Sequence, residues 1–189
     1  MKAYCINLKE RIDRWEQFNS QDLPMDFERV DAIKNDQGWV GCCESHFKVL
    51  ENIQQMTLVV EDDCQFMWPW DYVEHAMKQL PDNWNCLYLG ANLTRKIDRH
   101  SKNLYRLYGG YSSVAIIYHD NIIPKFIIAN KDKINRMDRF MVDVVQYHFN
   151  CYITCPMIVC QARSYSDITH DNINNGRIMR KHYIKYAED

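Results

Sequence analysis

The stretch Leu58-Val59-Val60-Glu61-Asp62-Asp63 decides the fold of this chain. Its first three residues form an apolar run that predicts a short buried strand. Three consecutive carboxylates follow, although charge near a core is costly unless it is paired or bound to a metal. Open α/β sheets bind ligands at the carboxyl ends of their strands, which is where these acids would lie. Such a cluster suits a hard divalent cation and a phosphate-bearing substrate, although the same acids could simply begin a loop.

The segments on either side of this stretch alternate between strand and helix patterns. Apolar runs predict strands over 4–8, 27–32, 86–89, 113–118 and 152–160, the last broken by Pro156. Apolar residues at helical spacing predict helices over 9–18, 42–53, 71–80, 121–130 and 136–149. The alternation predicts an α/β fold in one domain over residues 1–189, with a mixed sheet flanked by helices.

Two polar segments fall outside this alternation. Residues 91–108 carry several basic side chains and predict a solvated loop, with a mobile lid over an anionic ligand as the alternative. The segment from about residue 176 is basic and predicts a solvated helix, with contact to an acceptor or a membrane surface as the alternative.

The bulk composition sets limits on the class of protein. The chain has 189 residues, of which 47% are hydrophobic and 25% charged, and these values suit one domain with a full core. The formal net charge of −2 gives no strong electrostatic preference for nucleic acid. No apolar run approaches the roughly 18 residues of a membrane span. The first eight residues turn polar too soon for a signal peptide, so we expect a cytoplasmic protein.

The chain contains eight cysteines, which raises the question of disulfides or zinc. Cys42 and Cys43 are adjacent, and Cys151, Cys155 and Cys160 lack the paired Cys-x-x-Cys spacing of structural zinc sites. Free cysteine behaves as a small buried hydrophobe. We therefore expect reduced thiols in the core.

A series of short motifs resembles glycosyltransferase family 25, which includes lipooligosaccharide and procollagen galactosyltransferases. Each motif is short, but they follow the family's order over about residues 4 to 168. The loop after Asp31 departs from the family pattern, with Asn35-Asp36-Gln37-Gly38 in place of an Asp-Gly pair. The matching motifs are Ile6-Asn7-Leu8 followed by Arg11 and Arg14, Arg29-Val30-Asp31-Ala32, Gly41-Cys42-Cys43-Glu44-Ser45-His46, Val60-Glu61-Asp62-Asp63, Tyr88-Leu89-Gly90, the strand from Tyr111 to Tyr118, Val142-Asp143, and a closing segment with Pro156, Gln161 and Ser166-Asp167-Ile168.

The resemblance implies a GT-A-type fold and an inverting transfer of a hexose, galactose or glucose, from a UDP-sugar to an acceptor hydroxyl. It also implies a divalent cation, with Mn²⁺ favoured over Mg²⁺. This cation would stabilise the charge that develops on the departing diphosphate. The acceptor could be a glycan, a protein hydroxyl or a modified nucleic-acid base.

The acidic motif supplies the expected metal ligands. Glu61 and Asp63 lie two residues apart, so both point to one side of an extended chain. We expect Asp63 to bind the metal directly. Glu61 and Asp62 would provide a second ligand and a ribose or water contact, in an order that the sequence leaves open. His170 could complete the metal shell, with an exposed loop histidine as the alternative.

The remaining motifs supply the expected donor-binding residues. Arg11 could reach a phosphate, or could instead pair with Glu10 or Asp13. Asp31 could accept a hydrogen bond from the nucleotide base. His46 could lie near the donor or be a packed core histidine. By the resemblance, the donor-binding set is Asn7, Leu8, Arg11, Asp31, Ser45, His46, Glu61 and Asp62.

An inverting transferase needs a base that takes the proton of the acceptor hydroxyl, and a carboxylate is the usual choice in this fold. Asp143 lies in an apolar run and is the first candidate, since burial would raise its pKa. Asp138 is the reserve, and a structural hydrogen bond is the alternative for Asp143. Two other functions stay open: a metal-dependent phosphohydrolase using the same acids, and a non-catalytic nucleotide-sugar-binding protein.

Overall fold

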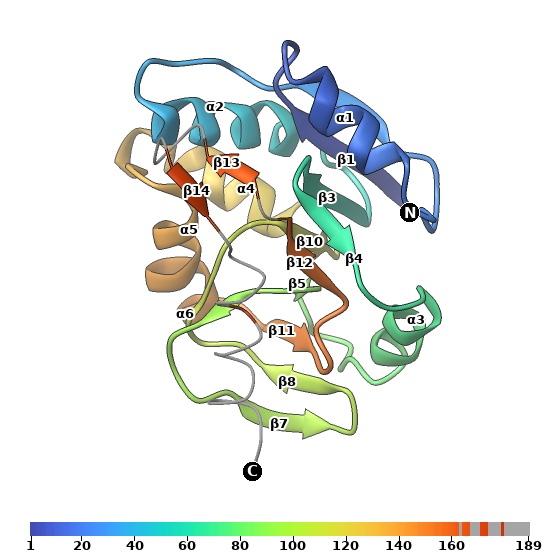
Figure 1. The fold of residues 1–189 in the computed structure, drawn as a ribbon. Helices are drawn as coiled ribbons and strands as arrows, with labels where there is room; N and C mark the ends of the chain where they lie inside the picture. The colour runs from blue at the N-terminus through green and yellow to red at the C-terminus, as the bar shows by residue number, and fades with distance from the viewer. Residues whose placement is uncertain (163, 167–170, 174–178, 180–189) are drawn as a thin grey trace.

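The computed structural model describes residues 1–162, 164–166, 171–173 and 179, and it is built around one eight-stranded mixed sheet (Figure 1). Three small two-stranded sheets complete the strands. The order across the large sheet is β2 (Glu28–Asp31), β1 (Lys2–Asn7), β3 (Thr57–Glu61), β10 (Ala115–Tyr118), β5 (Cys86–Tyr88), β11 (Cys151–Thr154), β8 (Leu104–Arg106) and β7 (Asp98–Ser101). The small sheets pair β12 (Val159–Gln161) with β4 (Cys64–Phe66), β6 (Asn92–Leu93) with β9 (Gly110–Tyr111), and β13 (Ser164–Ser166) with β14 (Asp171–Ile173).

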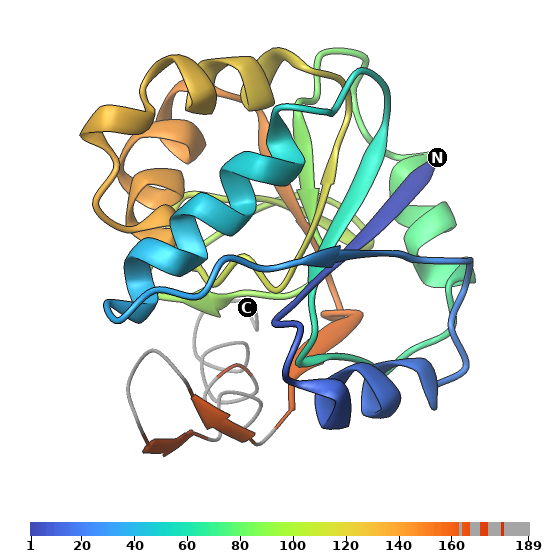
Figure 2. The same cartoon turned by 90° about the horizontal axis from the view of Figure 1, so that it is seen from above.

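Helices cover both faces of the large sheet, as Figure 2 shows. One face packs against α1 and α3, and the other against α2, α4 and α5. The helical segments are α1 (Ile12–Asn19), α2 (Gly38–Leu50), α3 (Asp71–Met77), α4 (Ile122–Ala129), a 3₁₀ turn (Lys131–Lys133), α5 (Met137–Phe140), a π-helical turn (Met141–Val145) and α6 (Gln146–His148).

The strand β1 shows how the two cores arise from the sequence. Tyr4 and Ile6 contribute to the core under α2, whereas Ala3 and Cys5 contribute to the core under α1. Successive side chains of a strand point to opposite faces, so a strand buried on both faces is a continuous apolar run. This is why the inner strands β3, β10 and β5 are short hydrophobic runs without alternation.

The connections of β1 create a switch point in the sheet. β1 pairs in parallel with β2 on one side and with β3 on the other. The chain runs from β1 through α1 to β2, on one side of β1. It then runs through α2 to β3, on the other side of β1. In open α/β sheets, ligands bind outside the carboxyl ends of the strands at such a point. Here those ends are Asn7 and Glu61.

The structure confirms the predicted α/β class with a mixed sheet flanked by helices. The prediction of a solvated loop over residues 91–108 was wrong, because β8 pairs with β11 inside the large sheet. Leu93, Leu104 and Leu107 are fully buried, while the polar residues of the edge strand β7 face solvent. The exposed polar residues of this segment lie mainly in the edge strand β7 and in the stretch 94–96 before it.

Other boundaries differ in detail from the prediction. The helix expected from residue 42 begins at Gly38, and the helix expected over 136–149 contains the π-helical turn. The extended segment around the cis peptide Cys155–Pro156 divides into β11 and β12. The basic segment from about residue 176 lies outside the described residues, apart from the buried Met179.

Two predictions from composition can be compared with the structure. All eight cysteines belong to the described residues, and all are free, which confirms the expected reduced thiols. Six of them are buried, and Cys42 and Cys155 are partly exposed. None of the described helices combines the length and apolar character that a membrane crossing requires.

Candidate functional site

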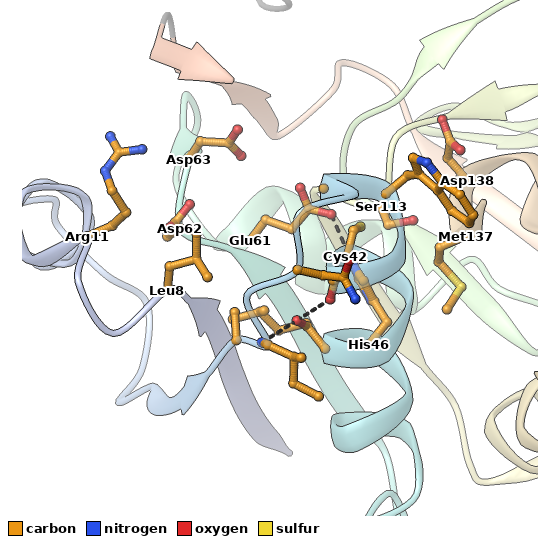
Figure 3. Close-up of a pocket in the computed structure, with 18 of the residues that line it drawn as sticks. Leu8, Arg11, Cys42, His46, Glu61, Asp62, Asp63, Ser113, Met137 and Asp138 are labelled. Carbon is orange, nitrogen blue, oxygen red and sulfur yellow. Dashed lines mark hydrogen bonds and ion pairs between the residues drawn. The ribbon is translucent and has the colours of Figure 1, made fainter. Parts of the chain in front are cut away.

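A pocket of about 840 Å³ opens at the switch point of the sheet (Figure 3). Its walls come from the ends of β1 and β3, from α2, from the segment before β10 and from the start of α5. Figure 3 shows Arg11, Asp62 and Asp63 on one side of the pocket and Ser113 and Asp138 on the other. The predicted acidic motif therefore lies in a cavity large enough for a small organic ligand.

Asp62 is held by partners on the α1 side of the pocket. Arg14 Nη1 donates to Asp62 Oδ1 at 2.9 Å, and Asn7 Nδ2 donates to Asp62 Oδ2 at 2.6 Å. Burial raises the pKa of the Asp62 carboxyl, and the Arg14 guanidinium and the Asn7 amide oppose that rise. Both oxygens are thus occupied by protein donors, so Asp62 fixes the end of β3 against α1.

Asp63 lies in a different environment, although it is the next residue. Its Oδ2 accepts one long hydrogen bond of 3.4 Å from Gln161 Nε2. Its Oδ1 is buried and has no hydrogen-bond partner among the described residues. Burial, together with the charges of Glu61 and Asp62, raises the pKa of Asp63 to about 8. A divalent cation would fit this site, because it would satisfy the buried oxygen and offset the clustered negative charge.

Glu61 lies between the adjacent aspartates, Asp62 and Asp63, and helix α2 (Figure 3). His46 Nε2 lies 3.1 Å from Glu61 Oε1. The ligand atoms of Cys42, His46 and Glu61 all lie within 4.8 Å of one another. Burial and the Glu61 charge raise the pKa of the Cys42 thiol, which is therefore neutral in the metal-free chain. These three side chains form a mixed sulfur, nitrogen and oxygen cluster at the centre of the pocket.

Ser45 shapes the wall that α2 contributes. Its Oγ donates to Gly41 O at 2.5 Å and accepts from the backbone N–H of Ile33 at 2.8 Å. A Cβ on Gly41 would lie 2.5 Å from Ile33 O, so glycine permits the close approach of the loop after β2. Ser45 thus positions the wall, and its hydroxyl is already occupied by protein groups.

The segment before β10, together with Asn92 of β6, forms a neutral polar wall that the sequence analysis did not identify. Asn92 Oδ1, Ser112 Oγ and Ser113 Oγ are buried and find no hydrogen-bond partner within the described part of the chain. All three residues line the pocket, and Ser112 has a φ of 82°, which is unusual for a residue other than glycine. A serine pair directly before an apolar strand was the sequence signal available for it.

A buried glutamine holds this neutral wall in place. Gln146 is fully buried, and its Oε1 accepts hydrogen bonds from the backbone N–H groups of Gly109 and Gly110 at 2.8 and 3.0 Å. Its Nε2 donates to Gly110 O at 2.8 Å. The strained backbone at Ser112 is therefore fixed by a rigid anchor from α6.

The predicted donor-binding residues divide into two groups. Leu8, Arg11, Ser45, His46, Glu61 and Asp62 line the pocket, and Asn7 lies behind it as a support for Asp62. Arg11 takes up the predicted salt bridge with Asp13, with two contacts of 2.9 Å. Asp31 is exposed at the end of β2 and does not line the pocket. Its backbone oxygen accepts a hydrogen bond from Lys48.

The expected burial of Asp143 is not observed. Its side chain is 46% exposed, lies outside the pocket and pairs with Arg139 at 3.3 Å. Met141, Val142 and Val145 occupy the buried face of the π-helical turn, which directs Asp143 to solvent. The reserve candidate Asp138 does line the pocket. His170 lies outside the described residues.

Comparison with known proteins adds no family to this geometry. Neither a protein-family model nor a curated protein matches the chain.

Proposed function

We propose that this chain is a GT-A-type glycosyltransferase that moves a hexose, galactose or glucose, from a UDP-sugar to an acceptor hydroxyl with inversion. The observation that carries the proposal is the carboxylate cluster at the switch point, with a buried Asp63 oxygen that has no partner among the described residues. The ordered motifs that resemble glycosyltransferase family 25 support it, because they supply most of the residues of this pocket.

Asp63 and Glu61 would hold the divalent cation, with Mn²⁺ favoured and Mg²⁺ possible. When bound, the cation would supply positive charge that stabilises the departing diphosphate. The chain contributes the fixed position of these acids, because the hydrogen bonds from Arg14 and Asn7 to Asp62 hold the end of β3. The long contact from Gln161 leaves Asp63 the more available of the two adjacent aspartates.

The neutral polar wall favours a sugar-bearing ligand over a simple phosphate ester. Asn92, Ser112 and Ser113 carry uncharged oxygens, which suit the hydroxyl groups of a hexose. A phosphohydrolase that uses the same acids has no need for such a wall. Ser113 of this wall lies on the opposite side of the pocket from Asp62 and Asp63, so one extended ligand could contact both sides (Figure 3).

Asp138 takes the role of general base in this proposal, in place of the exposed Asp143. The acceptor oxygen would attack the anomeric carbon while the bond from that carbon to the diphosphate breaks. The electron pair of that bond leaves with UDP, and the proton of the acceptor hydroxyl passes to the Asp138 carboxylate. The position of Asp138 on the side away from Asp63 suits attack opposite the leaving group.

A cytoplasmic location is part of the same proposal. Free thiols are typical of a reducing compartment, and all eight cysteines of this chain are free. A glycan, a protein hydroxyl and a modified nucleic-acid base remain the acceptor classes.

The experiment that tests the donor is thermal unfolding with a panel of nucleotide sugars, with and without Mn²⁺. A ligand that binds only the folded state stabilises it by about 2.7 kcal/mol at 100 times its dissociation constant. We expect a manganese-dependent increase in Tm with one UDP-sugar. An increase with phosphate esters alone would support the phosphohydrolase. Binding of a UDP-sugar without any transfer to an acceptor would support a non-catalytic binding protein.

The base is tested with a matched pair of substitutions. Asp138→Asn should retain UDP-sugar binding and lower the transfer rate by about 10²–10⁴-fold, the usual contribution of general-base catalysis. Asp143→Asn makes the same chemical change outside the pocket and should leave the rate unchanged. Equal rates for the two variants would remove Asp138 from this role.

A further inference from the structure

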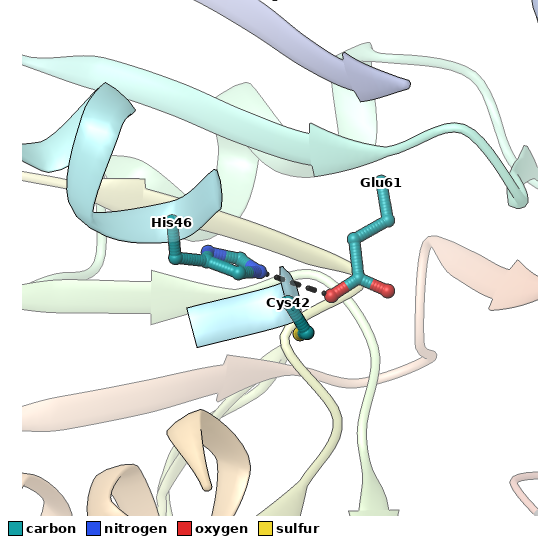
Figure 4. Close-up of side chains that lie close together, drawn as sticks. All are labelled: Cys42, His46 and Glu61. Carbon is teal, nitrogen blue, oxygen red and sulfur yellow. Dashed lines mark hydrogen bonds and ion pairs between the residues drawn. The ribbon is translucent and has the colours of Figure 1, made fainter. Parts of the chain in front are cut away.

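The proposed transferase reaction uses only part of the cluster at the centre of the pocket. Glu61 belongs to the proposed cation site, whereas Cys42 and His46 have no part in the transfer. The ligand atoms of the three residues lie within 4.8 Å of one another, and all three line the pocket. Figure 4 shows the Cys42 and His46 side chains directed from α2 toward the Glu61 carboxylate.

The spacing of the two α2 residues is that of a helical ligand pair. Cys42 and His46 lie four positions apart, so they occupy the same face of the helix, one turn from each other. Pairs of metal ligands at this spacing bind zinc in helical metalloprotease motifs. Glu61 enters the same space from the end of β3, so the ligands come from two elements that the fold holds together.

The donor atoms of this cluster differ in kind from those around Asp63. Thiolate and imidazole ligands favour zinc, whereas carboxylate oxygens alone favour manganese or magnesium. Catalytic zinc sites also have three protein ligands, and their fourth position is open to water or another ligand. The buried Nδ1 of His46 has no partner within the described residues, so no second contact fixes the orientation of the ring proton.

We propose that Cys42, His46 and Glu61 form a zinc site whose occupation inhibits the transferase. Binding of Zn²⁺ releases the Cys42 thiol proton to solvent and replaces the contact between His46 Nε2 and Glu61. It also withdraws Glu61 from the neighbouring cation site, so zinc and the UDP-sugar complex compete for one carboxylate. The inhibitory part rests on the proposed function, whereas zinc binding does not.

Titration of the metal-free full-length chain with Co²⁺ tests the site directly. Cobalt substitutes for zinc and gives an absorption band when a thiolate coordinates it. We expect this band in the unmodified chain, its displacement by Zn²⁺, and its loss in Cys42→Ser. Cys43→Ser is the matched control, because Cys43 is the next residue and lies outside the cluster. An unmodified chain without the band, or a Cys42→Ser variant that keeps it, would overturn the zinc site.

A second measurement covers the case in which Cys42→Ser does not fold. In the unmodified chain, Zn²⁺ should slow alkylation of Cys42 at least tenfold relative to Cys155, as read by peptide mass spectrometry. Cys155 is the other partly exposed cysteine and lies outside the cluster. Equal alkylation of Cys42 with and without Zn²⁺ would contradict the proposal.

The inhibitory part has its own readout. Micromolar Zn²⁺ should lower the Mn²⁺-dependent Tm increase given by the UDP-sugar. In Cys42→Ser, the Zn²⁺ concentration needed for the same effect should be at least tenfold higher. A cobalt band without any UDP-sugar binding would leave the zinc site standing and reject the transferase. A zinc effect that is identical in Cys42→Ser would reject the inhibitory role.

Discussion

The two aspartates that follow β3 occupy contrasting regions of the pocket. On the α1 side, Asp62 receives hydrogen bonds at both oxygens, from Arg14 and Asn7. On the β12 side, Asp63 receives one long contact from Gln161 and keeps a buried oxygen that no described residue satisfies. Two adjacent acids in one motif therefore serve different purposes. The paired side holds the architecture, and the unpaired side is available to a ligand.

The largest loss of stability should come from removing the ion pair between Arg14 and Asp62. Arg14→Ala leaves the Asp62 charge buried without its cation, and loss of one partner from a buried ion pair costs about 3–5 kcal/mol of unfolding free energy. Arg139→Ala is the matched control, because its pair with Asp143 is exposed and should contribute less than about 1 kcal/mol. Urea unfolding of both variants measures the difference. Similar losses would mean that Asp62 is not held by Arg14.

Substitution of Asp63, in contrast, should change metal affinity and not the unfolding free energy. Asp63→Asn removes the proposed metal ligand, and we expect Mn²⁺ affinity to fall by about 100-fold or more, since even outer-shell partners contribute 10–100-fold. The unfolding free energy without metal should not fall, because asparagine is neutral at every pH and avoids the cost of an ionised Asp63 beside Glu61 and Asp62. Calorimetric Mn²⁺ titration and urea unfolding check the two parts. Unchanged Mn²⁺ affinity would exclude Asp63 from the site.

The pH dependence of the unfolding free energy should also report on the unpaired Asp63. The pKa of Asp63 is raised from its ordinary 3.8 to about 8 in the folded chain, so folding favours the protonated acid. Its contribution is therefore fully present below about pH 4 and is lost as the pH rises through about 8. We expect the metal-free chain to lose at most about 1.4 kcal/mol per pH unit from this group across that window.

Urea unfolding in the presence of a chelator, at several pH values, measures this slope. Asp63→Asn should flatten it, and added Mn²⁺ should do the same in the unmodified chain because it favours the ionised acid. Parallel curves for the variant and the unmodified chain would show that Asp63 does not titrate in this range.

The sequence was sufficient for the fold class and for the position of the acids, but not for the roles of the two aspartates. Apolar runs and helical spacing are local signals, and they located the strand that ends at Glu61. The difference between Asp62 and Asp63 depends on Arg14, which lies 48 positions away and reaches Asp62 only through the folded α1. No local pattern contains that contact.

The errors have the same origin. Asp143 lies in an apolar run, which suggested burial, but only one face of its helical turn packs against the core. The polar segment 91–108 suggested a loop, but its scattered leucines pack into the core once β8 pairs with β11. In both cases tertiary packing decided the outcome. The neutral wall was missed because an adjacent serine pair, here Ser112 and Ser113, does not by itself indicate a ligand-binding surface.

The smallest expected effect is a loss of UDP-sugar affinity on substitution in the neutral wall, on the far side of the pocket from the two aspartates. Ser113→Ala removes a buried hydroxyl that has no hydrogen-bond partner in the described part of the chain, so stability should not fall. If the hydroxyl contacts the hexose, UDP-sugar affinity should drop by about 3–10-fold, the contribution of one hydrogen bond of roughly 1 kcal/mol.

Affinity for UDP alone should stay the same in Ser113→Ala, because the acids and the metal bind the nucleotide part. The ratio of UDP-sugar to UDP affinity is therefore the measurement, and Ser20→Ala, at an exposed site after α1, is the control. Equal losses for UDP and UDP-sugar would place the Ser113 hydroxyl beside the nucleotide. The neutral wall would then be part of a phosphate-binding surface together with the acids, and it would no longer favour a sugar over a phosphate ester.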